Sequence, residues 1–264
     1  METEIQQFEQ QNVPTIIESQ TKAEIDIQIA TAKRFPRDIR NSLQKIETYA
    51  TITEDVAGSC FYNLSRSGRT IEGPSTRLAE IVASQWGNIR TQVRILPHDG
   101  KTITAEAVCL DLETNVAYAG QASRRITDKN GKTYNEDMIV VTSQAAASVA
   151  LRNAIFKIVP PAILTDIFHH IKQVSVGSLK DMRTTRQNLL TAYSKMNVSE
   201  QMILDLMEKK DVSELDIDAI KVLRGIYNAL KEGETSVEES FIQPVEQRKK
   251  EKEQTETQKS VLEA

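Results

Sequence analysis

Cysteine is scarce in this sequence. Cys60 and Cys109 are the only two among 264 residues, and they lie far apart in apolar or strand-like contexts. A disulfide or a redox pair is the alternative, but disulfides are rare in cytosolic proteins. The sequence therefore predicts two buried free thiols.

Long apolar runs and secretory signals are missing as well. No run approaches the roughly 18 apolar residues that a membrane span needs. The start of the chain, Met1-Glu2-Thr3-Glu4, is acidic and unlike a signal peptide. We therefore expect a protein of the cytoplasm that does not enter a membrane.

Catalytic and metal-binding patterns are not visible either. His98 lies in a predicted turn, and His169-His170 lack the spacing and the cysteine or glutamate company of a zinc site. Asp111 and Glu113 lie two residues apart, as in a divalent-metal nuclease, but no Glu-x-Lys or Asp-x-Lys follows, so we interpret them as turn carboxylates. No serine or cysteine stands in a nucleophile elbow. The sequence predicts no enzyme, no metal site and no cofactor.

One glycine pair resembles part of a nucleotide-binding motif. The spacing of Gly68 and Gly73 is that of the start of a Walker A loop, but Pro74 stands where the motif requires lysine. We therefore exclude nucleoside triphosphate binding by this loop.

Charge is unevenly distributed along the chain. The net charge is -4, but residues 1–30 carry -5, residues 31–160 carry +4 and residues 161–264 carry -3. A basic middle between acidic ends suits a core that binds a polyanion and has solvating or self-regulating ends.

The stretch from Ile89 to Pro160 organises the rest of the chain. Apolar and polar residues alternate from Ile89 to Ile95, which is the period of a half-buried strand. Asp99-Gly100 suits a tight turn, and two further runs, 102–112 and 116–126, complete a predicted antiparallel meander. A hairpin-type loop follows at residues 128–132.

A helix of small residues closes this unit. The stripe that we expect to be buried on a helix over residues 144–159 consists of Ala147, Leu151, Ala154, Ile155 and Ile158. Its run 145–148 has little side-chain bulk, which lets the helix lie very close to a sheet. Pro160-Pro161 ends it.

A hairpin and a helix precede the meander. Residues 60–64 and 70–72 are predicted strands joined by a turn, and Gly73-Pro74-Ser75 opens a helix with proline at its first position. Arg66 and Arg69 on the turn, with Arg77 in the first helical turn, would surround backbone amides that favour an anion. This junction is a candidate phosphate site.

The two ends of the chain have a different character. Residues 1–22 are rich in Gln, Glu and Thr and predict a flexible leader. Residues 23–32 fit either a strand or a helix, and a helix is expected to begin near Pro36. Residues 161–242 predict helices, the last three forming a compact unit that ends at Gly233. Residues 243–264 predict a disordered charged tail or at best a solvated helix.

The order hairpin, strand and helix, with basic residues on the turns, resembles the core of the phage single-strand annealing proteins, the Erf, RecT and Redβ families. The closest segment is Ser143-Gln144-Ala145-Ala146-Ala147-Ser148-Val149-Ala150-Leu151-Arg152-Asn153-Ala154, which is similar to the Ala-rich, Arg-bearing helix of the Erf type. The likeness covers roughly the middle half of the chain. The strings 71–75, 78–80 and 86–88 also resemble a group of phage and prophage proteins, which implies less about function.

Pattern and resemblance together predict an α+β fold, in which an antiparallel β-meander packs on a long helix and a small all-α C-terminal unit follows. The expected divisions are a flexible leader (1–22), an annealing-like core (23–160), a helical C-terminal region (161–242) and a disordered charged tail (243–264).

The resemblance also implies a function. In these families DNA lies in a basic groove, so we expect a DNA-binding protein of phage recombination in the host-cell cytoplasm. It would bind single-stranded DNA without sequence preference, anneal complementary strands without ATP and form homo-oligomeric rings or filaments. The C-terminal region would recruit a phage exonuclease or a host single-strand-binding protein.

Annealing requires that backbones are held while the bases stay free to pair. The residues expected to contact phosphates are Arg66, Arg69, Arg77, Arg124, Arg125, Lys129, Lys132, Arg152 and Lys157. The tyrosines that could support bases are Tyr62, Tyr118 and Tyr134, although each also fits the core or a strand surface. Because only 5% of the residues are aromatic, backbone contacts should dominate the affinity and make it steeply salt-dependent.

Two other classes of function stay open from the sequence. One is a phage interaction protein that inhibits or scaffolds a host complex, with the hairpins as its docking surface and no nucleic acid. The other is a virion or virion-associated structural protein. The sequence does not choose between DNA and RNA, nor does it define the oligomer size.

Overall fold

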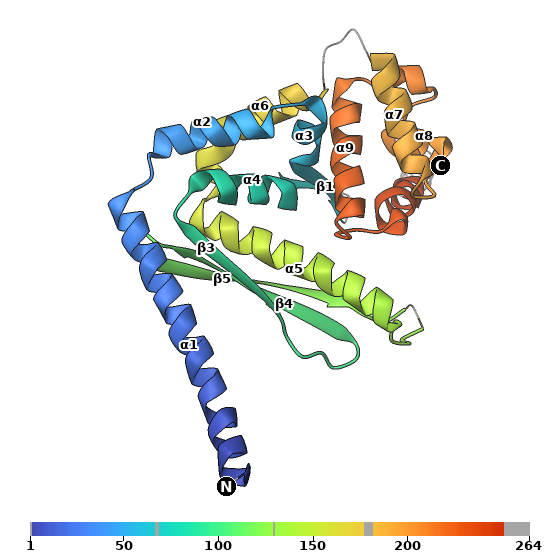
Figure 1. Ribbon diagram of the computed structural model, residues 1–264. Helices are drawn as coiled ribbons and strands as arrows, with labels where there is room; N and C mark the ends of the chain where they lie inside the picture. Colours follow the sequence, from blue (N-terminus) through green and yellow to red (C-terminus); the bar gives the residue numbers. More distant parts are fainter. Residues whose placement is uncertain (1, 67–68, 129, 177–181, 251–264) are drawn as a thin grey trace, which may run out of the picture.

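The computed structural model describes residues 2–66, 69–128, 130–176 and 182–250, with the backbone alone for 2–17, 65–66, 69–70 and 176. A three-stranded antiparallel sheet packs against one long helix, and smaller helices follow toward the C-terminus (Figure 1). The predicted α+β class, a meander on a long helix followed by an all-α unit, is confirmed.

The helices are α1 (Glu2–Arg34), α2 (Ile39–Ala50), α3 (Glu54–Ser59), α4 (Thr76–Trp86), α5 (Glu136–Ile158), α6 (Thr165–Val176), α7 (Met182–Ser194), α8 (Glu200–Met207) and α9 (Ile217–Lys231). The strands are β1 (Phe61–Arg66), β2 (Arg69–Pro74), β3 (Ile89–Ile95), β4 (Thr102–Asp111) and β5 (Val116–Arg125). Short 3-10 turns span Pro161–Leu164 and Val212–Glu214, and a π-helical turn spans Glu238–Ile242.

The meander has the order β3-β4-β5, and α5 covers one of its faces (Figure 1). Alternate residues of β4 point toward α5 and are buried, among them Ala105 and Ala107. Gly120 of β5 lies directly under the helix. A Cβ at this position would be 2.7 Å from the Ala150 carbonyl oxygen and 2.8 Å from the Ala154 nitrogen. Helix and strand therefore approach closely, as expected for a helix of small residues.

Helix α5 begins earlier than the sequence pattern indicated. Asn135 caps it by accepting a hydrogen bond from the Met138 N–H at 2.9 Å, and the helix starts at Glu136 rather than near Gln144. Its first turns carry exposed apolar residues, Val140 and Val141 among them. They form no buried stripe, so the periodicity gave no signal there. The helix ends at Ile158, with Val159 as its C-cap, before the two prolines as predicted.

The longer helix also corrects the prediction that no apolar segment approaches the length of a membrane span. An 18-residue window within α5 has a mean hydropathy of 1.3, which suits a membrane span by length and composition alone. However, Ala146, Ala150 and Ala154 of this helix pack into the hydrophobic core against the sheet. We therefore interpret α5 as the core helix of the fold.

The hairpin before the meander is confirmed, but its exit differs from the prediction. β1 and β2 are antiparallel, with Tyr62 opposite Gly73. Pro74 still belongs to β2, and Ser75 caps α4 by accepting a hydrogen bond from the Leu78 N–H at 3.3 Å. Proline is therefore not the first residue of the helix, because the serine one position later supplies the cap.

The N-terminal region, which includes the predicted leader, is helical. Residues 2–22 belong to α1, as do residues 23–32, for which strand and helix were both open. α1 projects away from the rest of the protein (Figure 1). α2 begins at Ile39 behind an Asp38 cap, not near Pro36, because the Asp38 side chain accepts hydrogen bonds from two amides of the first turn.

The described residues form two hydrophobic cores that share no member. The first combines α2, α3, β1, α4, β4, α5 and α6, and the second combines α7, α8, α9 and Phe241. Ile167 and Ile171 of α6 belong to the first core, so α6 packs with the elements that precede it. We call the two groups of elements the core unit and the C-terminal unit.

The C-terminal unit has the helices that the sequence predicted. Ile203, Leu215 and Leu223 are fully buried in it. Residues 243–250, expected as the start of a charged tail, continue as helix. Residues 251–264 lie outside the described residues.

Candidate nucleic-acid interface

Two of the predicted phosphate-binding arginines meet at the end of α9. Arg124 on β5 donates a hydrogen bond to the backbone carbonyl of Gly233, and Arg152 on α5 donates to the carboxylate of Glu234. Since their acceptors are consecutive residues, the two guanidinium groups lie close together. The side chain of Arg152 is only 10% exposed and that of Glu234 only 6%.

The position of Arg124 follows from strand geometry. It is paired with Ile103, whose side chain is buried under α5, so Arg124 lies on the helix-covered face of the sheet. Successive residues of a strand point to opposite faces. Arg125 is therefore on the other face, where it is exposed. The sequence grouped these neighbours as one site, and the structure separates them.

A tyrosine completes the arrangement. The guanidinium carbon of Arg152 lies 4.8 Å from the centre of the Tyr62 ring, a cation–π contact. Tyr62 packs over Gly73 of the opposite strand, because a Cβ on this glycine would be 2.6 Å from the tyrosine oxygen. We call Arg124, Arg152 and Tyr62 the arginine–tyrosine cluster. It joins β5, α5 and the β1–β2 hairpin.

The hairpin leads from this cluster to two further predicted residues. β1 continues from Tyr62 to Arg66, which pairs with Arg69 of β2. The side chains of Arg66 and Arg69 lie outside the described residues, as does the whole of Lys129.

The remaining predicted residues are distributed over other parts of the surface. Arg77 forms an ion pair with Glu80 at 2.5 Å, and both side chains are more than half exposed. The ammonium group of Lys157 donates to the Ala119 carbonyl oxygen of β5 at 2.6 Å. Lys132 is exposed in the loop after β5, Tyr118 is 47% exposed on β5, and Tyr134 is half-buried.

The turn that contacts the cluster is the C-terminal end of α9, where Gly233 caps the helix. Gly233 has a φ of +66°, its N–H bonds to the Leu230 carbonyl at 3.1 Å, and the Glu234 N–H bonds to the Ala229 carbonyl at 2.8 Å. These two bonds define a Schellman motif. The predicted cap at Gly233 is thereby confirmed, and it aims the Gly233 carbonyl and the Glu234 carboxylate at the arginines.

Glu232 precedes this turn and lies next to the same surface. Its Oε1 accepts hydrogen bonds from the Thr76 N–H at 3.3 Å and from the Thr76 hydroxyl at 2.6 Å. Its Oε2 is buried and has no partner among the described residues. Burial raises the pKa of Glu232, and the neighbouring charge of Glu234 raises it further.

A buried arginine elsewhere was not among the residues that the sequence singled out. Arg37 contacts Asp111 at 2.6 Å and Glu113 at 2.9 Å, and its guanidinium carbon lies 5.2 Å from the centre of the Trp86 ring. Its side chain is 8% exposed. The two turn carboxylates therefore fix the segment before α2 to the meander. Their pairing with an arginine far away in sequence left no local signal.

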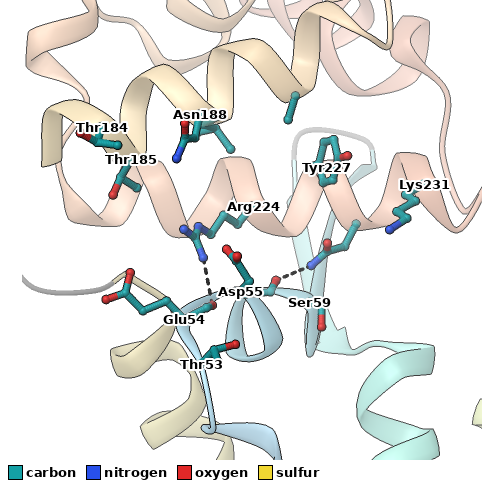
Figure 2. A pocket seen from close by; sticks show the side chains of 14 residues that line it. Thr53, Glu54, Asp55, Ser59, Thr184, Thr185, Asn188, Arg224, Tyr227 and Lys231 are labelled. Carbon is teal, nitrogen blue, oxygen red and sulfur yellow. Dashed lines mark hydrogen bonds between the residues drawn. The ribbon is translucent and has the colours of Figure 1, made fainter. Parts of the chain in front are cut away.

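A cavity of about 520 Å³ lies between the two units (Figure 2). Thr184, Thr185 and Asn188 of α7 line one wall, and Arg224, Tyr227 and Lys231 of α9 line another. The opposite wall is α3, where Arg224 donates to the Glu54 carbonyl at 3.1 Å. The acidic residues of its lining, Glu54 and Asp55, are on α3, and the basic residues, Arg224 and Lys231, are on α9. No buried polar side chain of the lining lacks a partner in the described chain.

The two cysteines behave as predicted. Cys60 and Cys109 are free and fully buried. Burial raises the pKa of Cys60 to about 12 and that of Cys109 to about 11. In the described part of the chain, no group of three or more His, Cys, Asp or Glu residues could hold a metal ion.

Comparison of the chain with protein-family models, with curated proteins and with solved structures found no match. What the geometry offers is a pair of adjacent guanidinium groups beside an aromatic ring, at the base of a hairpin that ends in two more arginines. Guanidinium groups are matched to phosphate oxygens in charge and shape.

Proposed function

We propose that the protein binds single-stranded DNA through the arginine–tyrosine cluster and the adjoining β1–β2 hairpin, and that it anneals complementary strands without ATP. The observation that carries this proposal is the meeting of Arg124 and Arg152, from β5 and α5, beside Tyr62. The meander on a long helix, which the resemblance to phage annealing proteins implies, holds these two arginines.

The chemistry of the cluster favours contacts with the DNA backbone over recognition of particular bases. Two guanidinium groups supply donors for phosphate oxygens, and an aromatic ring supports any base because every base has a π-face. Such a site holds a strand without choosing its sequence, which leaves base edges free to pair. Binding then weakens linearly with the logarithm of the salt concentration.

The exposed edges of the sheet support assembly into a homo-oligomeric ring or filament. β3 and β5 are the two edge strands of the meander, and each carries exposed apolar side chains on the α5 side, Ile95 on β3 and Val116 on β5. An unpaired edge is a template for another strand, and head-to-tail pairing of unlike edges builds rings or filaments. The expected setting is phage recombination in the host cytoplasm, with the C-terminal unit as the contact for a phage exonuclease or a host single-strand-binding protein.

The test compares two neighbouring arginines that point in opposite directions. A labelled oligothymidylate is titrated at low salt with wild type, Arg124→Gln and Arg125→Gln, and fluorescence anisotropy gives the affinities. Loss of a charged hydrogen bond should weaken binding by Arg124→Gln about ten- to a hundredfold. Arg125→Gln should change it little, because Arg125 lies on the other face of the sheet.

Equal losses in the two variants would mean that only the general positive field matters. No loss in Arg124→Gln, or no binding by the wild type, would remove the cluster from the function.

A protein-docking role is the second candidate. The exposed apolar residues at the start of α5, Met138, Val140 and Val141, favour it, since exposed neighbouring apolar side chains often mark an interface. A gel shift at low salt separates the two functions, because a docking protein of this kind would leave single-stranded DNA unshifted.

A further inference from the structure

The cluster proposed to hold DNA is occupied by the protein's own chain. Arg124 donates to the Gly233 carbonyl, Arg152 pairs with Glu234, and Glu232 lies beside them on Thr76. Gly233 and Glu234 thus present a carbonyl and a carboxylate to the arginines, and the Glu232 carboxyl group lies beside them. This is the kind of oxygen-rich, anionic group that a phosphodiester backbone would present at the same place.

Glu234 is the charged partner of Arg152 in this contact. Two adjacent guanidinium groups repel each other, and the Glu234 carboxylate, which accepts a hydrogen bond from Arg152, offsets part of that repulsion. Arg152 and Glu234 are both at least nine-tenths buried. Without Glu234, Arg152 would need another anion, because an unpaired buried charge is strongly unfavourable.

The interface that brings residues 232–234 to the cluster has the character of a docked, separable contact. The core unit and the C-terminal unit have separate hydrophobic cores. Between them Asn228 donates to the Gly58 and Phe61 carbonyls at 2.6 Å, and Asn63 donates to the Val222 carbonyl at 3.3 Å. The cavity of about 520 Å³ also lies along this interface. Polar interfaces between units allow relative motion.

Resting on the proposed function, we infer that the C-terminal unit is autoinhibitory. In the docked state, residues 232–234 cover the arginine–tyrosine cluster, and single-stranded DNA binds after it has displaced them. The apparent affinity of the full chain is then the intrinsic affinity multiplied by the fraction of molecules in which the unit is undocked. A change that weakens docking but leaves the arginine–tyrosine cluster intact should therefore strengthen DNA binding.

The first test removes the competing charge. Glu234→Gln should bind a labelled oligothymidylate about tenfold more tightly than wild type, because the undocked fraction rises. The matched control is Glu200→Gln, which removes the same charge from an exposed site on α8 of the same unit. Circular dichroism of each variant checks that the helices are retained.

The second test fixes the C-terminal unit in its docked position with a disulfide. A Cβ at Gly225 would lie 2.9 Å from the Cβ of Asn63, and a disulfide joins Cβ atoms about 3.8 Å apart. A small outward shift therefore allows Asn63→Cys with Gly225→Cys to form a staple. The same protein is then measured oxidised and reduced. We expect strong DNA binding in the reduced form and little in the oxidised form.

The outcomes separate the two proposals. If the wild type binds DNA but Glu234→Gln matches Glu200→Gln, or if oxidation of the staple leaves the affinity unchanged, autoinhibition is overturned and DNA binding stands. If the wild type, Glu234→Gln and the reduced staple all fail to bind, both proposals are overturned.

Discussion

The contact between Gly120 and α5 is the feature of the fold on which the position of Arg152 depends, and it makes a sharp prediction about stability. In Gly120→Ala the new Cβ would stand 2.7 Å from the Ala150 carbonyl oxygen and 2.8 Å from the Ala154 nitrogen. Ordinary contacts of a Cβ begin at 3.4 Å. Both neighbours are backbone atoms of a helix and cannot rotate away, so α5 must lift from the sheet by several tenths of an ångström.

The cost follows from two opposing effects. Overpacking of a tight interface costs about 1–3 kcal/mol, whereas alanine reduces the entropy of the unfolded chain and returns about 0.4–1 kcal/mol. We therefore expect Gly120→Ala to lower the free energy of unfolding by about 1–2 kcal/mol in urea titrations with an unchanged m-value. The control, Ala119→Val, adds more atoms on the exposed face of the same strand and should stay within about 0.5 kcal/mol of wild type. A Gly120→Ala protein as stable as wild type would refute the close approach of helix and sheet.

Two further predictions concern charged groups. Arg37→Ala should destabilise the protein by about 3–5 kcal/mol, because two largely buried carboxylates lose their partner, whereas the exposed Arg40→Ala should have little effect; equal unfolding midpoints in urea would contradict the buried pairing. The raised pKa of Glu232 means that the folded protein holds the proton of the Glu232 carboxyl group more tightly than the unfolded chain does. The stability that this protonation contributes is therefore present below the ordinary pKa of 4.5 and is lost as the pH rises through the raised pKa. Glu232→Gln cannot ionise, so its stability relative to wild type should rise between about pH 5 and about pH 8; a constant difference in urea titrations at the two pH values would argue against a raised pKa.

Much of the fold was predictable because its signals are local. The first strand of the meander alternates in polarity, the turns between its strands contain Gly or Asn at positive φ, and two prolines stop α5. The start of α5 was not predictable from periodicity, since Met138 and Val141 are exposed apolar residues on no buried stripe. Only the Asn135 cap marks that boundary.

The candidate site was predictable in part. Composition and resemblance selected Arg124, Arg152 and Tyr62, which do meet. They could not tell Arg124 from Arg125, because the face that a strand residue occupies depends on the register of the sheet. Nor could they reveal Glu234 as the partner of Arg152, since an ion pair across 82 positions leaves no pattern in the sequence.

The two proposals also make the acidic C-terminal part of the chain functional rather than merely solvating. Its charge of -3 over residues 161–264 opposes the +4 of residues 31–160, and residues 232–234 bring part of that charge onto the basic cluster. A partner that binds the C-terminal unit and undocks it would expose the cluster. Recruitment to a nuclease or to a single-strand-binding protein would then also be activation.

The most direct measurement of the central claim is annealing itself. Two complementary oligonucleotides carrying a donor and an acceptor dye are mixed without ATP, with and without the protein, and energy transfer reports duplex formation. The account predicts that the wild type accelerates annealing, that the acceleration falls steeply with added salt, and that Arg124→Gln loses most of it while Arg125→Gln does not. Annealing at the spontaneous rate in the presence of the wild type, or equal acceleration by both variants, would contradict it.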